Sequence, residues 1–265
     1  MKKKIACIGI VLVMGAALAA CGGASGNSGI SGDDYAALET VQEKIDSIKD
    51  AEIELKIESS VKSGNASDST TIETDAVVRE VVHPGGGMDM EIHQKQTTDG
   101  KKESFVIYVK DGKTYVNTGK EKASFNDDQM YGNLGTMAQN LVLGLDKNAV
   151  QGVTKKEEKE QNVYQITIDN DKFMEFAAAA EGSDKKDKAE LIPASVEKLD
   201  FQVITDKANV PKTVRLDCLY SIPDEGQDGK FMESSYKLQA EYRSVNTGRS
   251  IGFPDFSKYK ESGEV

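Results

Sequence analysis

The sequence predicts an α+β fold that is mainly antiparallel β: a strongly curved half-barrel sheet whose apolar face is covered by helices. Three observations lead to this prediction. In many short segments apolar residues alternate with polar ones. This is typical of antiparallel strands with one buried face and one solvent-exposed face. No unbroken apolar run of the kind found in buried parallel strands occurs after residue 20. Few helical segments accompany these strands, so a large one-faced sheet must curl around them to bury its apolar side.

The first 20 residues have the pattern of a secretory signal. Three lysines precede an apolar run from Ile5 to Ala20, which is too short to span a bilayer comfortably. The segment that ends at Cys21, "LAAC", resembles the bacterial lipobox. This resemblance implies a diacylglycerol thioether on Cys21, cleavage before that residue and acylation of the new amino end. The alternative is an ordinary signal peptide with a cysteine there by chance.

Residues 21–33 are rich in glycine and serine and predict a flexible tether. Such a chain spans about 20 Å as a random coil. Two or more acyl chains on Cys21 would anchor it stably to a membrane. We therefore expect a lipid-anchored protein on the extracytoplasmic face of the cell membrane, with one folded domain over residues 34–260.

Charge and cysteine content limit the partners of this domain. Loss of residues 1–20 changes the formal charge from −11 to −14, which disfavours nucleic acid as a partner. Cys218 would be the one cysteine left besides Cys21, so no intramolecular disulfide is available. Cys218 lies in a strand pattern and is expected to be a small core residue. We expect the protein to be a monomer.

The domain begins with an amphipathic helix over residues 34–49, after which eight to ten strands follow. Turns are predicted at 83–87, at 224–230 and at 110–113, where Asp111-Gly112 suits a type I′ hairpin. The helix face comprises Tyr35, Leu38, Val41, Ile45 and Ile48. The inward strand positions are Ile53, Leu55, Ile57, Val61, Met88, Met90, Ile92, Phe105, Ile107, Val109, Tyr164, Ile166, Ile168, Leu199, Phe201, Val203, Val214, Leu216, Cys218, Tyr220, Tyr236, Leu238, Ala240 and Tyr242.

Two further helices are predicted, over residues 127–143 and 171–181. Asn126 suits an N-cap of the first of them, whose two glycines weaken it by about 1 kcal/mol each. The second ends at Gly182. One stripe of the first helix carries Met130, Leu134, Met137 and Leu141.

This order of elements, joined to a lipobox, resembles the LolA-like group of bacterial lipoproteins, which includes the LppX–LprG-like lipoproteins and uncharacterised lipoproteins of Gram-positive type. The resemblance is carried by the hairpin at 108–120, "YVKDGKTYVNTGK", and by the segment 241–256, "EYRSVNTGRSIGFPDF". It implies a half-barrel with helices over its concave face, and an apolar hollow that holds acyl chains in some members and is packed solid in others.

No residue pattern predicts catalysis, a metal site or a cofactor. The two histidines are His83, in a turn, and His93, which is expected to face solvent with Asp89 and Glu91. The triplet at 169–171, "DND", lacks the glycine and glutamate of a calcium loop and suits a helix cap instead. No common hydrolase or nucleotide-binding motif occurs, so we expect a protein that is not an enzyme.

The methionines leave two functional hypotheses open. Met is flexible and adapts to varied apolar ligands, but it also fills cores that are poor in aromatic residues. If a hollow exists, its expected lining is Met88, Met90, Ile92, Met130, Leu134, Met137 and Leu141. The chain would then bind or carry a lipid or another apolar molecule. If the hollow is packed solid, the domain would be an interaction or sensing module of the cell envelope that binds partners on its wet face.

Overall fold

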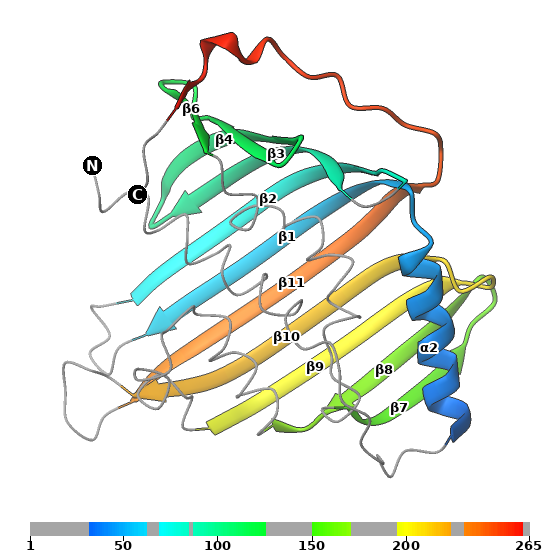
Figure 1. Cartoon of the computed structure of the whole chain (residues 1–265). Helices are drawn as coiled ribbons and strands as arrows, with labels where there is room; N and C mark the ends of the chain where they lie inside the picture. The colour runs from blue at the N-terminus through cyan, green and yellow to red at the C-terminus, as the bar shows by residue number, and fades with distance from the viewer. Residues whose placement is uncertain are drawn as a thin grey trace, which may run out of the picture.

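A computed structural model gives the fold, and it describes residues 32–62, 69–84, 87–125, 150–170, 195–223 and 231–261 (Figure 1). These residues form one large sheet, a helix and a short 3-10 turn, η2 (Phe256–Lys258). The helix is α2 (Gly32–Asp46), and the strands are β1 (Asp50–Lys62), β2 (Ser69–Val82), β3 (Met88–Thr98), β4 (Lys101–Lys110), β5 (Lys113–Asn117), β6 (Lys122–Phe125), β7 (Val150–Glu157), β8 (Gln161–Ile168), β9 (Ser195–Asp206), β10 (Pro211–Pro223), β11 (Phe231–Val245) and β12 (Lys260–Glu261).

The described strands make a single twelve-stranded sheet in the order β12-β6-β5-β4-β3-β2-β1-β11-β10-β9-β8-β7. Neighbouring strands are antiparallel, apart from β12, which runs parallel to β6. Figure 1 shows that the sheet is strongly curved and does not close into a barrel. The predicted antiparallel class and the curved, open sheet are therefore confirmed, with more strands than the eight to ten expected.

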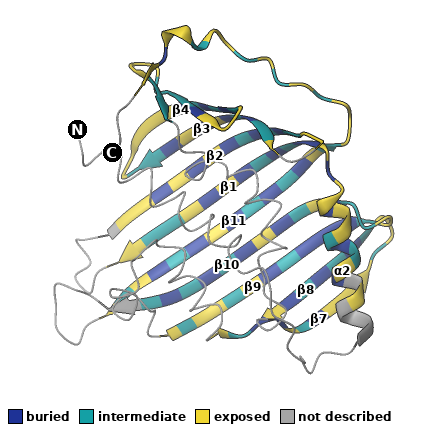
Figure 2. Ribbon diagram, in the orientation of Figure 1, coloured by how far each residue is buried: buried dark blue, intermediate teal, exposed yellow. Residues whose placement is uncertain are grey.

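One face of this sheet, the inner face, carries the apolar core. Along the long strands, buried positions alternate with exposed or half-buried ones, which gives the banding in Figure 2. Of the predicted inward strand residues, all are buried except three. Met88 and Leu199 are partly buried against the core, and Val61 is 37% exposed near the end of β1. The prediction for Val61 was wrong because the strand continues beyond the part of the face that is covered.

Strand β2 is the main element that the sequence pattern does not predict. Its inward positions are mixed, with Thr74 and Glu80 among apolar residues. Its outward positions include Val77 and Val81, so neither face stands out as apolar. The pairing of β2 with β1 and β3, rather than its own hydrophobic pattern, sets its register.

Helix α2 buries the predicted face at one end of the sheet. Leu38, Val41 and Ile45 are buried in the core, as is Ile48 just after the helix. Its main contacts are with β7 and β10, and Figure 1 shows it lying across that end of the inner face. Among the described residues no helix is long and apolar enough to cross a bilayer. The predicted signal (1–20), the predicted tether (21–33) up to residue 31, and the helices predicted over 127–143 and 171–181 lie outside the described residues. The last two residues of the predicted tether, 32 and 33, belong to α2 instead, which begins two residues earlier than predicted.

Two hairpins of the same type join neighbouring strands. Asp111 and Gly112 have φ values of 52° and 71°, which confirms the predicted type I′ geometry between β4 and β5. Asp99 and Gly100, with φ values of 49° and 78°, form the turn between β3 and β4, which was not predicted from the sequence. Both turns need positive φ at two successive residues, and Asp-Gly supplies it with little strain.

The start of β1 is tied to the chain just after β11. The Asp50 carboxylate accepts hydrogen bonds from the backbone N–H of Thr247 (2.9 Å), the Thr247 hydroxyl (3.0 Å) and the backbone N–H of Gly248 (3.0 Å). The backbone N–H of Asn246 also donates to the carbonyl oxygen of Asp50 (2.8 Å). Burial works to raise the pKa of Asp50, but these hydrogen bonds outweigh it and lower the pKa below its ordinary value.

We expect Asp50→Ala to lower the free energy of unfolding at pH 7 by about 1.5–3 kcal/mol, because hydrogen bonds to a charged acceptor are lost. Since the folded-state pKa is depressed, this contribution is fully present above the ordinary pKa of 3.8 and is lost as the pH falls through the lower folded-state value. Urea unfolding at pH 7 and at pH 2–3 measures both parts. Asp75→Ala, at an exposed position of the next strand, is the control. A difference between wild type and Asp50→Ala that is the same at both pH values would contradict this account.

Candidate functional site

The strand half of the predicted ligand lining lies on the inner face. Met90 and Ile92 of β3 are buried, with 0% and 1% of their surface exposed, and Met88 is partly buried against the core. Their Cα partners on β4 are Val109 for Met90 and Ile107 for Ile92. Met130, Leu134, Met137 and Leu141, which make up the predicted helix half, lie outside the described residues.

Ile92 belongs to an apolar row that crosses six neighbouring strands. Because antiparallel strands lie about 4.8 Å apart, the row is about 24 Å long. Its members are paired in register from strand to strand, and all but Val116 are fully or almost fully buried. We call this row the apolar band: Tyr242 (β11), Ile53 (β1), Val78 (β2), Ile92 (β3), Ile107 (β4) and Val116 (β5).

Beside the apolar band, the inner face carries uncharged polar side chains. Thr74, Gln94 and Gln96 are each about 95% buried, and Thr98 follows at the end of β3. The Gln94 amide donates to the Gln96 Oε1 at 3.5 Å, and the Gln96 amide donates to the Thr98 hydroxyl at 3.1 Å. We call Thr74, Gln94, Gln96 and Thr98 the polar patch. The sequence pattern does not predict this patch, because a polar residue at an inward position looks the same in sequence as one at an outward position.

A carboxylate also lies on the inner face. Glu80 is fully buried, with Ala51 and Met90 as its Cα partners on the neighbouring strands. Burial and the nearby Glu80 carboxylate together raise the pKa of the Tyr242 hydroxyl. The signal that could have found Glu80 is its setting in "VVREVV" (residues 77–82), where an acid stands between pairs of valines.

The outer face carries ion pairs instead. Arg79 donates to Glu52 (2.8 Å) and to Glu91 (2.9 Å), and His93 Nε2 lies 2.8 Å from Glu91. Partial burial works to raise the pKa of Glu91, but the hydrogen bonds from His93 and Arg79 outweigh it, so its pKa is lowered. His93 is exposed, as predicted. His83 lies 3.1 Å from another carboxylate, Asp89. Over the described ranges, no group of three metal-ligating side chains comes together.

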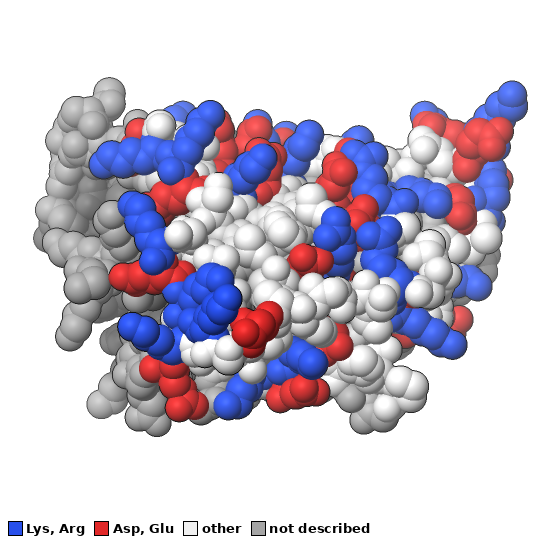
Figure 3. All heavy atoms as spheres, turned by 90° about the horizontal axis from the view of Figure 1, so that it is seen from above, with Lys and Arg blue, Asp and Glu red and all other residues white. Residues whose placement is uncertain are grey.

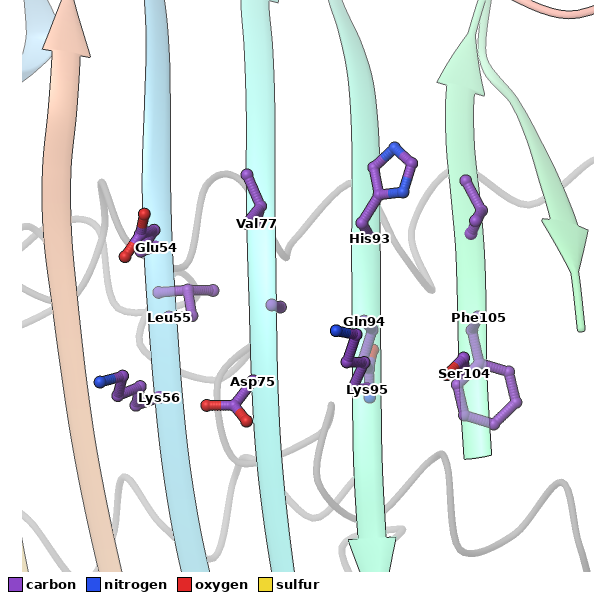
Figure 4. A pocket seen from close by; sticks show the side chains of 12 residues that line it. Glu54, Leu55, Lys56, Asp75, Val77, His93, Gln94, Lys95, Ser104 and Phe105 are labelled. Atoms are coloured by element: carbon purple, nitrogen blue, oxygen red, sulfur yellow. The ribbon is translucent and has the colours of Figure 1, made fainter. Parts of the chain in front are cut away.

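Two open depressions lie on the outer face. The first has a volume of about 420 Å³, and Figure 4 shows Glu54, Val77, His93 and Lys95 contributed by three neighbouring strands, β1, β2 and β3. The second, of about 390 Å³, lies over β7–β10. Figure 3 shows that basic and acidic side chains are interspersed on the side of the molecule it presents. Neither depression gathers a set of catalytic groups.

The two segments that carry the family resemblance contact each other. Residues 246–261, which we call the C-terminal strap, pack against β4 and β5. Phe256 stacks on Tyr115 with ring centroids 3.7 Å apart, and Phe253 lies edge-on to Tyr108 at 6.1 Å. Tyr259 completes the cluster, 5.6 Å from the Tyr115 ring. These resemblance motifs are therefore structural: they hold residues 246–261 on the sheet.

The sequence matches no protein-family model and no curated protein. In structure, the chain is similar to LprF from Mycobacterium bovis, with 12% identity, a TM-score of 0.43, and coverage of 84% of this chain and 98% of that one. It is also similar to the lipoprotein LppX from Mycobacterium tuberculosis, with 10% identity, a TM-score of 0.39, and coverage of 83% and 98%. A LolA superfamily protein from Nitrosomonas europaea matches with 10% identity, a TM-score of 0.22, and coverage of 86% and 97%.

All three matches have TM-scores below 0.5, and the LolA-like resemblance stays an expectation from the sequence. The three proteins are similar to this chain in the arrangement of their elements, with sequence identities of 10–12%. The function proposed below therefore rests on the side chains of the inner face and not on these similarities.

Cys218 of β10 is a buried thiol on the inner face, as predicted. Burial, with a smaller effect from neighbouring Asp217, raises the pKa of this thiol to about 12. Because the thiolate is the reactive form, Cys218 is expected to be inert in the folded protein.

In the mature chain with Cys21→Ser, Cys218 is the remaining thiol. We expect it not to react with Ellman's reagent at pH 8 until the protein is unfolded in urea. A second variant that also carries Cys218→Ser and Lys237→Cys places a thiol on the exposed face of the neighbouring strand and is expected to react at once. Rapid reaction of Cys218 in the folded chain would show that this part of the inner face is open to solvent.

Proposed function

We propose that this chain is an extracytoplasmic lipoprotein, anchored to the membrane through Cys21, that binds or carries a lipid or another apolar molecule against the inner face of its half-barrel. The observation that carries the proposal is the apolar band. It is continuous across six strands of the inner face.

The length and chemistry of the band suit an acyl chain. Each buried methylene contributes about 0.8 kcal/mol, so twelve of them contribute about 10 kcal/mol before the cost of association. That cost is about 4–15 kcal/mol. Binding of practical strength therefore needs a long contact with apolar side chains and not a single small pocket, and a band about 24 Å long supplies such a contact.

A second candidate function is an interaction or sensing module that uses the outer face. The observation that favours it is the depression of about 420 Å³ over β1–β4, in which Val77 and Val106 lie between charged side chains. The two functions differ in the face they use, so substitutions at adjacent residues of one strand can separate them.

For the first candidate, we expect the delipidated mature chain (residues 21–265 with Cys21→Ser) to bind the apolar dye N-phenyl-1-naphthylamine saturably. Ile92→Asn places an amide in the apolar band and is expected to weaken dye binding by about 5- to 150-fold, because burying an unpaired amide costs about 1–3 kcal/mol. His93→Asn, the next residue on the opposite face, is the matched control and should leave dye binding unchanged.

Thermal unfolding shows whether Ile92→Asn is folded at the assay temperature, and Ile92→Thr is the milder substitute if it is not. The absence of saturable dye binding by the wild-type mature chain would contradict the first candidate and favour the second. So would equal binding by folded Ile92→Asn and by wild type.

The membrane anchor has a separate test. We expect wild-type protein to incorporate radioactive palmitate and to sediment with washed membranes, and Cys21→Ser to do neither. Cys218→Ser is the matched control, because it removes a thiol that is buried in the fold. The lipoprotein assignment would be contradicted if Cys21→Ser stays in the washed membranes and the wild-type protein incorporates no palmitate.

A further inference from the structure

We propose that the polar patch binds the neutral hydrogen-bonding group of the ligand, so that the ligand is an uncharged amphiphile: an acyl chain that carries a hydroxyl, ester or amide group. This inference rests on the proposed function, because it assigns the apolar band to the tail of the same ligand. It adds the position and the chemical class of the head.

The first support is a buried hydroxyl that lacks a partner. Thr74 is 4% exposed, and its Oγ1 has no hydrogen-bond partner in the described structure. An unpaired buried hydroxyl costs about 1–3 kcal/mol, so native proteins contain few of them. On the inner face Thr74 has Ile57 on one side and Gln96 on the other as its Cα partners. A ligand hydroxyl or carbonyl placed there would supply the missing hydrogen bond.

The second support is the direction of the side-chain amides on β3. The Gln94 amide donates to Gln96, and the Gln96 amide donates in turn to the Thr98 hydroxyl, so the chain of hydrogen bonds runs toward the turn at Asp99-Gly100. Each amide has a carbonyl oxygen with two lone pairs and two N–H donors, which is more than these bonds use. The patch can therefore accept from and donate to one ligand group.

The patch lies next to the apolar band along the same strand. Gln94 is two residues from Ile92 on β3 and shares its face, which corresponds to about 7 Å along the strand. A ligand whose tail lies along the band can thus reach the patch with a head that is only a few bonds long.

The charges around the patch favour a neutral head. Alternation places Glu73, Asp75 and Lys95, which are charged neighbours of Thr74, Gln94 and Gln96 along the strands, on the opposite face. At the rim, exposed Glu103 is the Cα partner of Gln96, and exposed Lys101 is the partner of Thr98. These two opposite charges give no net attraction for an anionic or a cationic group.

The experiment compares three ligands with one tail: dodecane, dodecan-1-ol and dodecanoate. Each displaces N-phenyl-1-naphthylamine from the unlipidated mature chain. We expect dodecan-1-ol to bind more tightly than the other two. Thr74→Val keeps the shape of the side chain and removes the hydroxyl, and it is expected to weaken dodecan-1-ol about 5- to 10-fold with dodecane unchanged. Gln96→Leu is a second variant that should act in the same direction.

Thr71→Val, at an exposed position of β2, is the matched control and should change none of the three affinities. If neither the dye nor any of the three ligands binds to wild type, the proposed function itself fails. If the dye and dodecane bind but dodecan-1-ol has no advantage, the proposed function stands and the assignment of the polar patch is wrong. The same holds if Thr74→Val weakens dodecane and dodecan-1-ol equally.

Discussion

The register between β1 and β11 is the constraint on which the rest of the structure depends. These strands lie at the centre of the sheet and join residues that are far apart in sequence, such as Ile53 and Tyr242. Because side chains alternate with a period of two, a slip by one residue would turn the apolar side chains of a strand outward. The hydrogen bonds from Thr247 and Gly248 to Asp50 fix one end of this pairing. The position of the apolar band follows from that register.

The same register makes the outer face a binding surface for the C-terminal strap. Arg249 of the C-terminal strap donates to Glu52, which also accepts from Arg79 of the next strand. From there the strap reaches β4, β5 and β6. Its last part, β12, pairs with β6, which is the outermost antiparallel strand on that side of the sheet. An uncovered strand edge is a template for aggregation, and a covering strand reduces that risk. The C-terminal strap thus stabilises the register between β1 and β11 and also covers the edge of the sheet at β6.

Much of the fold could be predicted from the sequence because most strands carry at least three apolar residues in alternation along one side. Strands β8, β10 and β11 show the period of two plainly, and α2 shows the period of 3.6. Strand β2 could not be found this way, since Thr74 and Glu80 interrupt its inward side. In the candidate site, too, one part could be predicted from the sequence and another could not. Met90 and Ile92 were found by their alternation, but the polar patch was not, because a polar residue at an inward position is revealed only by the pairing of its strand.

The composition of the inner face bears on what it does. A face that served only as a core would be more stable with valine or leucine in place of Thr74 and Gln96, since apolar replacement of buried polar groups is often neutral or stabilising. Yet these polar side chains are buried and lie within a few residues of the apolar band. Local stability does not explain the buried Thr74 hydroxyl, which has no partner among the described residues. Recognition of a ligand does, because the group that completes its hydrogen bonding arrives with the bound molecule. A face divided between an apolar row and a neutral polar patch matches an amphiphile better than a pure hydrocarbon or an ion.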